Sequence, residues 1–491
     1  MPEFSPSKRH LLQLLSTHEI EDIHNVSLMI LQKRGVMIKN DRGLNLLNDF
    51  GCEVDFEKKV VHIPQHLVEE CMSKAPSIIR LYDRDGKHEL IIGENHTIFN
   101  PGSTAVHFMD HETGDIRKPL SKDLIELVKL ADALEHIHAQ STALVPSDVS
   151  KEICDLYRLY LVLKNSPKPI ITGAFTKQGL VDMKRLLEVV VGGEEKLAIK
   201  PMAIFDACPS SPLMWSDISC ENLIDCASSS LPAEIIPAPQ MGATSPVTLA
   251  GTLAQSNAEF LSGLVISQIT NPGAPVIYGG SPTTFDMKCC TSRPGTIESM
   301  MLACAYSQIG KHYGLPTHAY LGLSDSKIID AQTGMESSLG IILGVLAGIN
   351  VISGPGMLIF ESCQSLEKLV VDNEICGMSL RLSKGIIVNN DSFASTVISR
   401  VGPGGHYLAE EHTRKWLERE HFMPSDVIDR LTMKAWKKQG SKNTTSRARE
   451  IVDRILRESV PELLPNDIRN NLKEILKEIM TRYNIKSVPI L

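Results

Sequence analysis

The strongest constraint on the fold is a regular alternation of strand-like and helix-like segments between residues 96 and 383. Short apolar segments bounded by turn residues predict strands, and apolar residues at helical spacing predict helices between them. The pair recurs every 30–40 residues. Such alternation predicts a parallel sheet, and a count of eight indicates a closed (β/α)8 barrel, with an open doubly wound sheet as the alternative. The predicted strands are 97–100, 138–145, 169–173, 202–206, 234–237, 275–278, 317–321 and 350–353.

Segments with a different pattern flank this region. Residues 1–95 predict an N-terminal α/β cap, and residues 384–491 predict a helical extension with a structural or oligomerising role. In the cap we expect helices at 18–35 and 64–74, strands at 60–63, 78–82 and 88–92, and an Asp-Gly turn at 82–87. In the extension we expect helices at 406–420, 425–438, 446–457 and 465–483.

The loops that follow the predicted strands are polar and rich in Gly and Pro. Such loops hold irregular backbone in place, and in βαβ units the functional groups lie at the carboxyl ends of the strands. The stretch 316–361 gathers several such groups after two successive strands, so we expect the site there. The helix at 336–349 is apolar or small on nearly every side, which predicts that it is buried all round.

Composition excludes several classes of function. The formal net charge of −8 argues against a nucleic-acid-binding role. The chain contains no run of 18 apolar residues, and its first fifteen residues lack the apolar core of a signal peptide. Eleven cysteines without metal-ligand spacing favour reduced thiols, and we expect Cys208, Cys289, Cys290 and Cys363 to be small packed residues. We therefore expect a cytoplasmic protein with no membrane partner.

Familiar catalytic and metal-binding motifs are absent. The sequence has no phosphate-binding P-loop, no strand-anchored G-x-G-x-x-G, no H-E-x-x-H and no G-x-S-x-G. His107 and His111 are spaced for one helical face, but nearby Pro and Gly favour a turn. No metal site is predicted.

Three segments resemble the trimethylamine methyltransferase family of corrinoid-dependent enzymes: YGGSPTTFDM from residue 278, THAYLGLSDSKIIDAQTGMESSLG from residue 317 and SGPGMLIFESCQSLEKLVVDNEICGM from residue 353. The resemblance extends over nearly the whole chain. It implies a (β/α)8 barrel, an amine substrate and transfer of a methyl group to the Co(I) centre of a separate corrinoid protein. It also implies no tightly bound cofactor, because the corrinoid (cobalamin) belongs to that partner, and we expect a homo-oligomer.

The founding members of the family carry pyrrolysine, whereas this sequence has only the twenty standard residues. The chain is more similar to the branch without pyrrolysine, which implies a quaternary amine, with glycine betaine the leading candidate and dimethylglycine its product. Proline betaine, carnitine and trimethylamine remain alternatives, as does a non-catalytic betaine-binding protein on the same fold. A zinc-dependent methyltransferase is disfavoured by the His and Cys spacing.

A methylated ammonium ion is bound by aromatic faces and polar groups. Among the residues near the loops, the predicted catalytic groups, which orient the amine or receive the corrin edge, are Asp325, Gln332 and Glu361. Asp325 is also a possible helix N-cap. The predicted substrate-binding groups are Tyr320, Phe360, His318, Tyr278, Phe99, Asn100 and His107.

Overall fold

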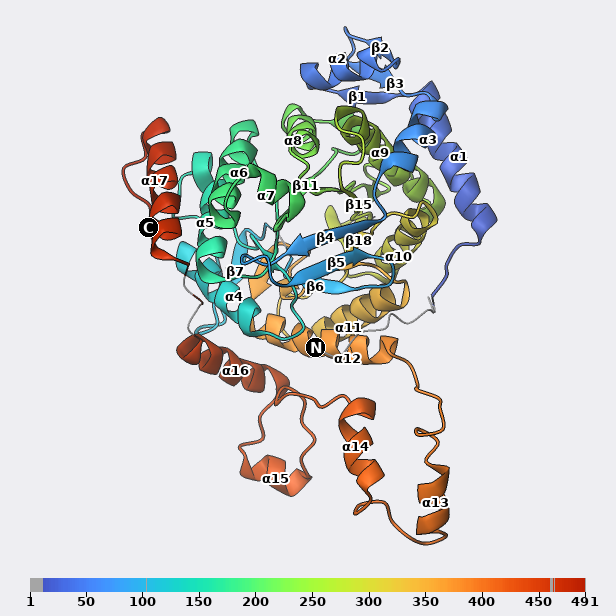
Figure 1. Cartoon of the computed structure of the whole chain (residues 1–491), viewed down its shortest axis with the longest axis vertical. Coiled ribbons are helices and arrows are strands. Elements are labelled where there is room, and N and C mark those ends of the chain that lie inside the picture. The colour runs from blue at the N-terminus through green and yellow to red at the C-terminus, as the bar shows by residue number, and fades with distance from the viewer. Residues whose placement is uncertain (1–11, 103, 460–461, 463, 491) are drawn as a thin grey trace.

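Eight short strands alternating with helices form the centre of the molecule, as the computed structural model shows (Figure 1). The structure describes residues 12–102, 104–459, 462 and 464–490. Most of the first fifteen residues, which were predicted not to form a signal peptide, therefore lie outside the described residues. All eight predicted strands are confirmed, each two to five residues long. They are β6 (Ile98–Asn100), β9 (Gln140–Ser141), β10 (Ile170–Thr172), β11 (Ala203–Ala207), β13 (Ala233–Ile235), β15 (Val276–Tyr278), β18 (His318–Tyr320) and β19 (Val351–Ser353).

These strands pair only in parallel within the described residues. Five form one sheet in the order β15-β13-β11-β10-β9, and three form another in the order β18-β19-β6. A parallel bridge between Tyr278 and Thr317 connects β15 to the segment leading into β18. On the other side, the His138 N–H donates to the Phe99 carbonyl at 2.8 Å. Consecutive strands of the series are therefore neighbours in space, as βαβ units predict.

One long helix follows each strand, close to where the sequence predicts it. Six of these helices begin at a Ser, Thr or Asp whose side chain accepts a hydrogen bond from the first turn. Such caps satisfy backbone N–H groups and fix where each loop ends. The helices are α4 (Ser121–Ala133), α5 (Cys154–Asn165), α6 (Lys177–Val191), α8 (Asp217–Ser228), α9 (Leu249–Thr270), α10 (Ile297–His312), α11 (Ala331–Leu346) and α12 (Leu366–Ser383).

The prediction that the helix after β18 is buried all round is wrong. On α11, Met335 is 60% exposed and Leu339 is 50% exposed. Small residues face the strands instead: a Cβ atom at Gly340 would lie 2.1 Å from the Leu321 carbonyl oxygen. The close approach of helix and strand therefore requires small residues on the inner face and leaves large apolar ones on the outer face.

A β-hairpin covers the amino-terminal ends of the strands. β4 (Ile78–Tyr82) and β5 (Glu89–Gly93) pair antiparallel around the predicted Asp-Gly turn, and Figure 1 shows them crossing the strands. The Tyr82 N–H donates to the Pro201 carbonyl just before β11, and the Asn350 amide donates to the Gly93 carbonyl just before β19. Apolar residues of hairpin and strands form one buried cluster: Ile79, Leu81, Ile92, Ile98, Ile171, Ile204, Ile277 and Val351.

The rest of the N-terminal region packs against the helices. The Ser27 hydroxyl on α1 (Thr17–Lys33) donates to the Ala254 carbonyl on α9 at 2.9 Å. The predicted helix at 64–74 is confirmed as α3 (Gln65–Lys74), and a helix that was not predicted, α2 (Asp41–Asp49), begins at Asn40. Its nine residues are too few to give a clear period. Short strands accompany these helices: β1 (Val36–Ile38), β2 (Glu53–Asp55) and β3 (Val60–His62).

The C-terminal extension has two parts. α16 (Thr444–Glu458) packs against α12, where Arg449 and Glu367 form an ion pair at 3.1 Å, and α17 (Asn466–Arg482) packs against α6. Three shorter helices lie between α12 and α16 in the sequence and extend away from the strands (Figure 1): α13 (Ser395–Val401), α14 (Glu411–Glu420) and α15 (Met433–Lys438). The helix predicted at 425–438 is therefore confirmed only in its second half. No helix among the described residues is both long and apolar enough to cross a membrane.

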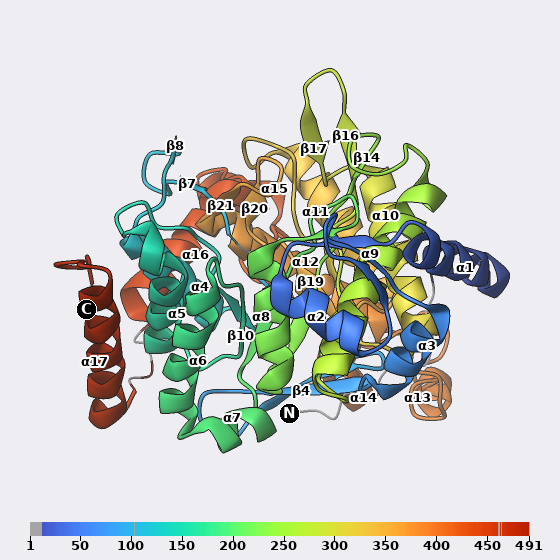
Figure 2. The ribbon, with the colours of Figure 1, turned by 90° about the horizontal axis from the view of Figure 1, so that it is seen from above.

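The carboxyl ends of the strands lie opposite the β4–β5 hairpin. Figure 2 shows β4 at one side of the molecule and short additional strands at the other. These strands belong to the loops that follow β6, β13, β15 and β19. They are β7 (His107–Met109), β8 (Ile116–Arg117), β14 (Gln240–Met241), β16 (Thr283–Asp286), β17 (Thr291–Arg293), β20 (Met357–Leu358) and β21 (Cys363–Ser365).

Candidate active site

A cavity of about 360 Å³ lies at the carboxyl ends of the strands. Its lining comes from the ends of seven strands or the loops that follow them, and from Ser219 and Asn222 on α8. Two other cavities lie beside α7 (Glu194–Ile199) and beside α16, and neither contains a predicted site residue. The polar and aromatic residues of the cavity at the strand ends include Phe175, Asp206, Cys208, Ser281, Tyr320 and Glu361.

Glu361 reaches the cavity from a strained turn between β20 and β21. Ile359, Phe360 and Glu361 have φ angles of 53°, 55° and 68°, a left-handed run of three residues without a glycine. Each residue held in this region costs about 1–3 kcal/mol. The turn is held by the Ile359 N–H, which donates to the Ser326 carbonyl at 3.0 Å, and by the Ser362 hydroxyl, which donates to the Ile359 carbonyl at 2.6 Å. Stored strain of this kind is typical of functional sites.

Carboxyl groups dominate the electrostatics of the cavity. Burial raises the pKa of Glu361 to about 8, and the nearby Asp325 carboxylate adds to this rise. Burial also raises the pKa of Asp206 well above its ordinary value, and the Glu234 carboxylate raises it further. Neither side chain has a cationic partner in the cavity wall that the structure describes. An uncompensated pair of carboxyl groups favours a positively charged ligand.

His318 and Glu234 form the layer below the cavity. His318 Nδ1 lies 2.6 Å from Glu234 Oε1, so one proton lies between them, and His318 Nε2 lies 2.9 Å from the Ser353 hydroxyl. That hydroxyl donates to Asn100 Oδ1 at 2.7 Å. The Tyr320 ring stands perpendicular to the imidazole, with centroids 4.7 Å apart. His318 and Asn100 are therefore buried positioning groups beneath Tyr320.

Three polar residues after β18 form hydrogen bonds within their own segment or with the segment that precedes α10. Glu336 Oε2 accepts hydrogen bonds from the Ser324 hydroxyl at 2.6 Å and from the Asp325 N–H at 2.8 Å. Gln332 donates to Glu336 Oε1 at 2.9 Å and is exposed. Asp325 accepts from the Gly295 N–H at 3.0 Å, and burial raises its pKa to about 6. The N-cap of α11 is Asp330 rather than Asp325.

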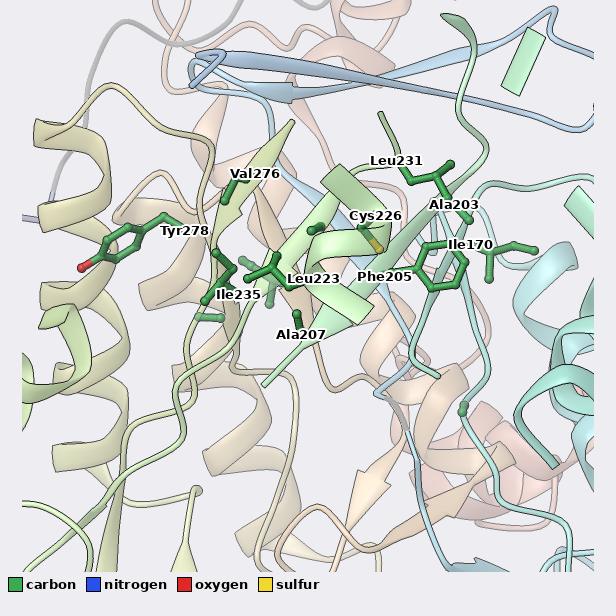
Figure 3. Close-up of a cluster of buried hydrophobic side chains, with 14 of the residues drawn as sticks. Ile170, Ala203, Phe205, Ala207, Leu223, Cys226, Leu231, Ile235, Val276 and Tyr278 are labelled. Carbon is green, nitrogen blue, oxygen red and sulfur yellow. The ribbon is translucent and has the colours of Figure 1, made fainter. Parts of the chain in front are cut away.

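The remaining predicted residues lie away from the cavity. Phe99 is fully buried and stacks on His138 with centroids 5.9 Å apart. Tyr278 points outward from β15 (Figure 3), where its ring lies 4.2 Å from that of Phe260. Phe360 faces the Lys327 ammonium, 3.9 Å from its ring centroid, and His107 lies on β7. Of the ten predicted residues, Tyr320 and Glu361 line the cavity.

Phe175, Asp206 and Cys208 are among the cavity residues that were missed. Phe175 and Cys208 follow β10 and β11, and Asp206 lies near the end of β11. The signal that could have found them was their place at the carboxyl ends of predicted strands. The prediction that Cys208 is packed is wrong, because it is exposed at the cavity, as Cys289 and Cys290 are exposed on the β16–β17 turn; Cys363 is buried as predicted. Burial within the protein and the nearby carboxylates raise the pKa of the Cys208 thiol, so the thiolate is disfavoured.

Comparison with known proteins gives a consistent result. The profile of a family described as "Trimethylamine methyltransferase (MTTB)" matches residues 4–482. The chain is 32% identical over 449 residues to trimethylamine methyltransferase MttB from Desulfitobacterium hafniense, covering 91% of this chain and 90% of that one. It is 32% identical over 453 residues to glycine betaine methyltransferase from another strain of that species, covering 92% and 94%. Among solved structures, the monomethylamine methyltransferase MtmB from Methanosarcina barkeri matches with a TM-score of 0.50 and 11% identity, over 93% of this chain and 97% of that one.

Proposed function

The chain belongs to the trimethylamine methyltransferase family, and on this premise we propose that it transfers a methyl group from a quaternary ammonium compound to the Co(I) centre of a separate corrinoid protein. The product is a tertiary amine. The observation that carries the proposal is the pairing of two aromatic rings, Phe175 and Tyr320, with two carboxyl groups, Asp206 and Glu361, around one cavity. Aromatic faces and carboxylates together are the groups that bind a methylated ammonium ion.

The chemistry needs no nucleophile from this chain. The bonding pair of the N–CH₃ bond stays on nitrogen as a lone pair, and Co(I) supplies the electron pair for the new bond and becomes Co(III). Since a quaternary nitrogen leaves as a neutral amine, it needs no prior activation, which fits a sequence made only of the twenty standard residues. The protein's tasks are to bind the cation, exclude water and orient the methyl group, and orientation contributes up to about 7–11 kcal/mol.

Phe175, Tyr320 and the carboxyl groups each have a place in this mechanism. A ring face adjacent to a methylated cation contributes about 0.5–2 kcal/mol. Asp206 and Glu361 balance the positive charge while the substrate is bound. As the methyl group leaves, the nitrogen becomes neutral, the carboxyl groups lose their counter-ion, and release of the tertiary amine is favoured. His318, 4.7 Å from Tyr320, positions that ring.

We also infer that the eight strands close into a barrel. Support comes from the Tyr278–Thr317 bridge on one side and the His138–Phe99 hydrogen bond on the other, which link the two sheets. The β4–β5 hairpin covers the amino-terminal end of the strands, so the corrinoid protein approaches the carboxyl ends. No tightly bound cofactor of this chain itself is required.

Methylation of Co(I) tests the proposal. The protein is mixed with a reduced corrinoid protein and, separately, with glycine betaine, proline betaine, carnitine, choline, tetramethylammonium or trimethylamine, while the Co(I) absorbance is followed. Loss of absorbance with at least one quaternary amine, together with release of its tertiary amine, is the expected result. Turnover of trimethylamine alone would contradict the argument from charge on nitrogen. Binding of a cation without transfer to any reducible corrinoid partner would instead indicate a non-catalytic binding protein.

A further inference from the structure

We propose that the substrate cation carries no carboxylate, so that this chain acts on amines of the choline or tetramethylammonium type rather than on betaines. The inference rests on the proposed function and narrows its substrate class. It departs from glycine betaine, which the family resemblance alone favours. It is carried by the lining of the cavity at the strand ends, which holds two carboxyl groups and, among the described residues, no Lys, Arg or His.

The unpaired polar atoms at this cavity are hydrogen-bond acceptors. The neighbour of the Asp206 carboxyl group is Glu234, another carboxyl group, so Asp206 Oδ1 receives no hydrogen bond from an N–H donor among the described residues, and neither does Asn222 Oδ1. Asn222 is 4% exposed, and its amide nitrogen donates to the Ala174 carbonyl, so its oxygen is the free atom. Buried acceptor atoms without donors favour a ligand that carries hydrogen-bond donors or a positive charge. A betaine carboxylate would bring further acceptors and a negative charge, whereas the hydroxyl of choline would bring a donor.

Arg158 is a buried cation that lies behind the Phe175 side of this wall. Its guanidinium carbon is 4.8 Å from the centroid of Phe175, a residue that lines the cavity, while Arg158 itself is 1% exposed. Nη2 donates to the Thr142 carbonyl, and Nε and Nη1 have no partner within the described chain. Arg158 also lies close enough to Asp206 and Asp155 to interact with their charges. Because Arg158 is buried and does not line the cavity, its donors are not presented to a ligand there.

A second layer of acidic groups strengthens this argument. Glu234 is fully buried below Asp206, and Asp325 lies near Glu361. Glu234 has His318 as its partner, but the two cavity carboxyl groups have no cation on the cavity side. A bound cation favours the ionised forms of Asp206 and Glu361, so a carboxylate on the same ligand would meet like charge at close range, which disfavours binding.

A matched pair of ligands tests the inference with the full-length protein alone. Choline and glycine betaine share a trimethylammonium group on a methylene and differ in a hydroxymethyl group against a carboxylate. We expect calorimetric titration at pH 8 to give a Kd for choline at least tenfold below that for glycine betaine, with tetramethylammonium also binding more tightly than the betaine. Equal or tighter binding of glycine betaine would overturn the inference.

Variants identify the groups responsible. Asp206→Asn should weaken choline binding about tenfold and reduce the preference for choline over glycine betaine. The matched control is Asp286→Asn, because Asp286 pairs with Arg293 on the β16–β17 turn and does not line the cavity; it should change neither Kd. Arg158→Met should leave the ratio of the two Kd values unchanged, and a selective loss of betaine binding in that variant would overturn the inference.

Methyl transfer separates this inference from the proposed function. Demethylation of glycine betaine with choline inert would overturn the ligand class while the methyltransferase function stands. Tight and selective binding of choline without any transfer would support the ligand class while the methyltransferase function fails.

Discussion

His318 and Glu234 form a fully buried pair beneath the cavity, with Nδ1 of the imidazole 2.6 Å from Oε1 of the carboxyl group and neither side chain exposed. They come from β18 and β13, which belong to different sheets. The pair therefore ties the two sheets together across the interior of the strands. It also supports Tyr320, whose ring contacts the imidazole edge to face. One interaction thus serves both the fold and the site.

Removing the imidazole should destabilise the protein strongly. His318→Gln leaves the Glu234 carboxyl group buried without its partner, and breaking one side of a buried pair costs about 3–5 kcal/mol. Urea unfolding measures this loss. The double variant His318→Gln/Glu234→Gln should recover at least half of it, because a neutral amide replaces the unpaired carboxyl group. The control is His18→Gln, whose parent side chain is 83% exposed. A loss no larger than the control's would show that the pair contributes nothing to stability.

Cation affinity should depend on pH through Glu361. Its pKa is raised to about 8 in the folded protein, so below pH 8 the free protein holds a proton on this carboxyl group. A bound cation favours the carboxylate, so binding releases that proton below pH 8. The Kd for tetramethylammonium should therefore fall as pH rises from 6 to 8, by up to about tenfold per pH unit, and level off above pH 8.

The variant Glu361→Gln tests whether this carboxyl group causes the pH dependence of the Kd. Asp325 and Cys208 are the other titratable groups that act on Glu361 or are acted on by it. The pKa of Asp325 is raised to only about 6, and that of the Cys208 thiol is raised out of the working range. Calorimetry with the variant should give a weaker and nearly constant Kd between pH 7 and pH 9. A slope that persists in the variant would assign the titration to another group, with Asp206, whose pKa is also raised by burial and by Glu234, as the remaining carboxyl group in the cavity lining.

Most of the fold could be predicted from the sequence because strand-like and helix-like segments alternate regularly along it. All eight strands were predicted, since each is an apolar segment between turn residues, and parallel pairing follows from the helices between them. The environment of α11 was not predicted, because Gly340 and Leu339 are both compatible with a buried helix when read without their neighbours. Contact with the Leu321 carbonyl decides which face is buried, and that contact is a property of the assembled structure.

The site was predicted in position but only partly in composition. Placing the functional groups at the carboxyl ends of the strands led to Tyr320 and Glu361, which line the cavity. Tyr278 was selected by the same rule, yet it is the last residue of β15 and its side chain points outward to the helices. With strands of only three residues, an error of one position reverses the direction of a side chain. Asp206 was missed although it is the last residue of the predicted strand 202–206 and begins the loop that follows.

Substitutions of Phe175 should distinguish the contribution of its aromatic ring to cation affinity from that of its apolar bulk. Phe175 lines the cavity and is 36% exposed. Phe175→Leu keeps an apolar side chain but removes the ring face, so the affinity for tetramethylammonium should fall by about 0.5–2 kcal/mol. Phe175→Tyr, which retains the ring, is the matched control and should keep most of the affinity. Calorimetry measures both, and equal Kd values for Leu and Phe at this position would mean that the ring does not contact the cation.

Two glycines of α11 test whether the close packing of this helix holds Tyr320 in position at the cavity. At Gly340 an added Cβ would lie 2.1 Å from the Leu321 carbonyl oxygen, whereas at Gly334 it would meet nothing within 4 Å. Gly340→Ala must therefore push α11 away from the residue that follows Tyr320, with an overpacking cost of about 1–3 kcal/mol. Gly334→Ala adds a better helix former in open space and should be neutral or stabilising by up to about 1 kcal/mol. Urea unfolding and the Kd for tetramethylammonium measure the two effects, and we expect only Gly340→Ala to weaken both. If the two variants behaved alike, the close packing of α11 on Leu321 would not be what holds Tyr320 at the cavity.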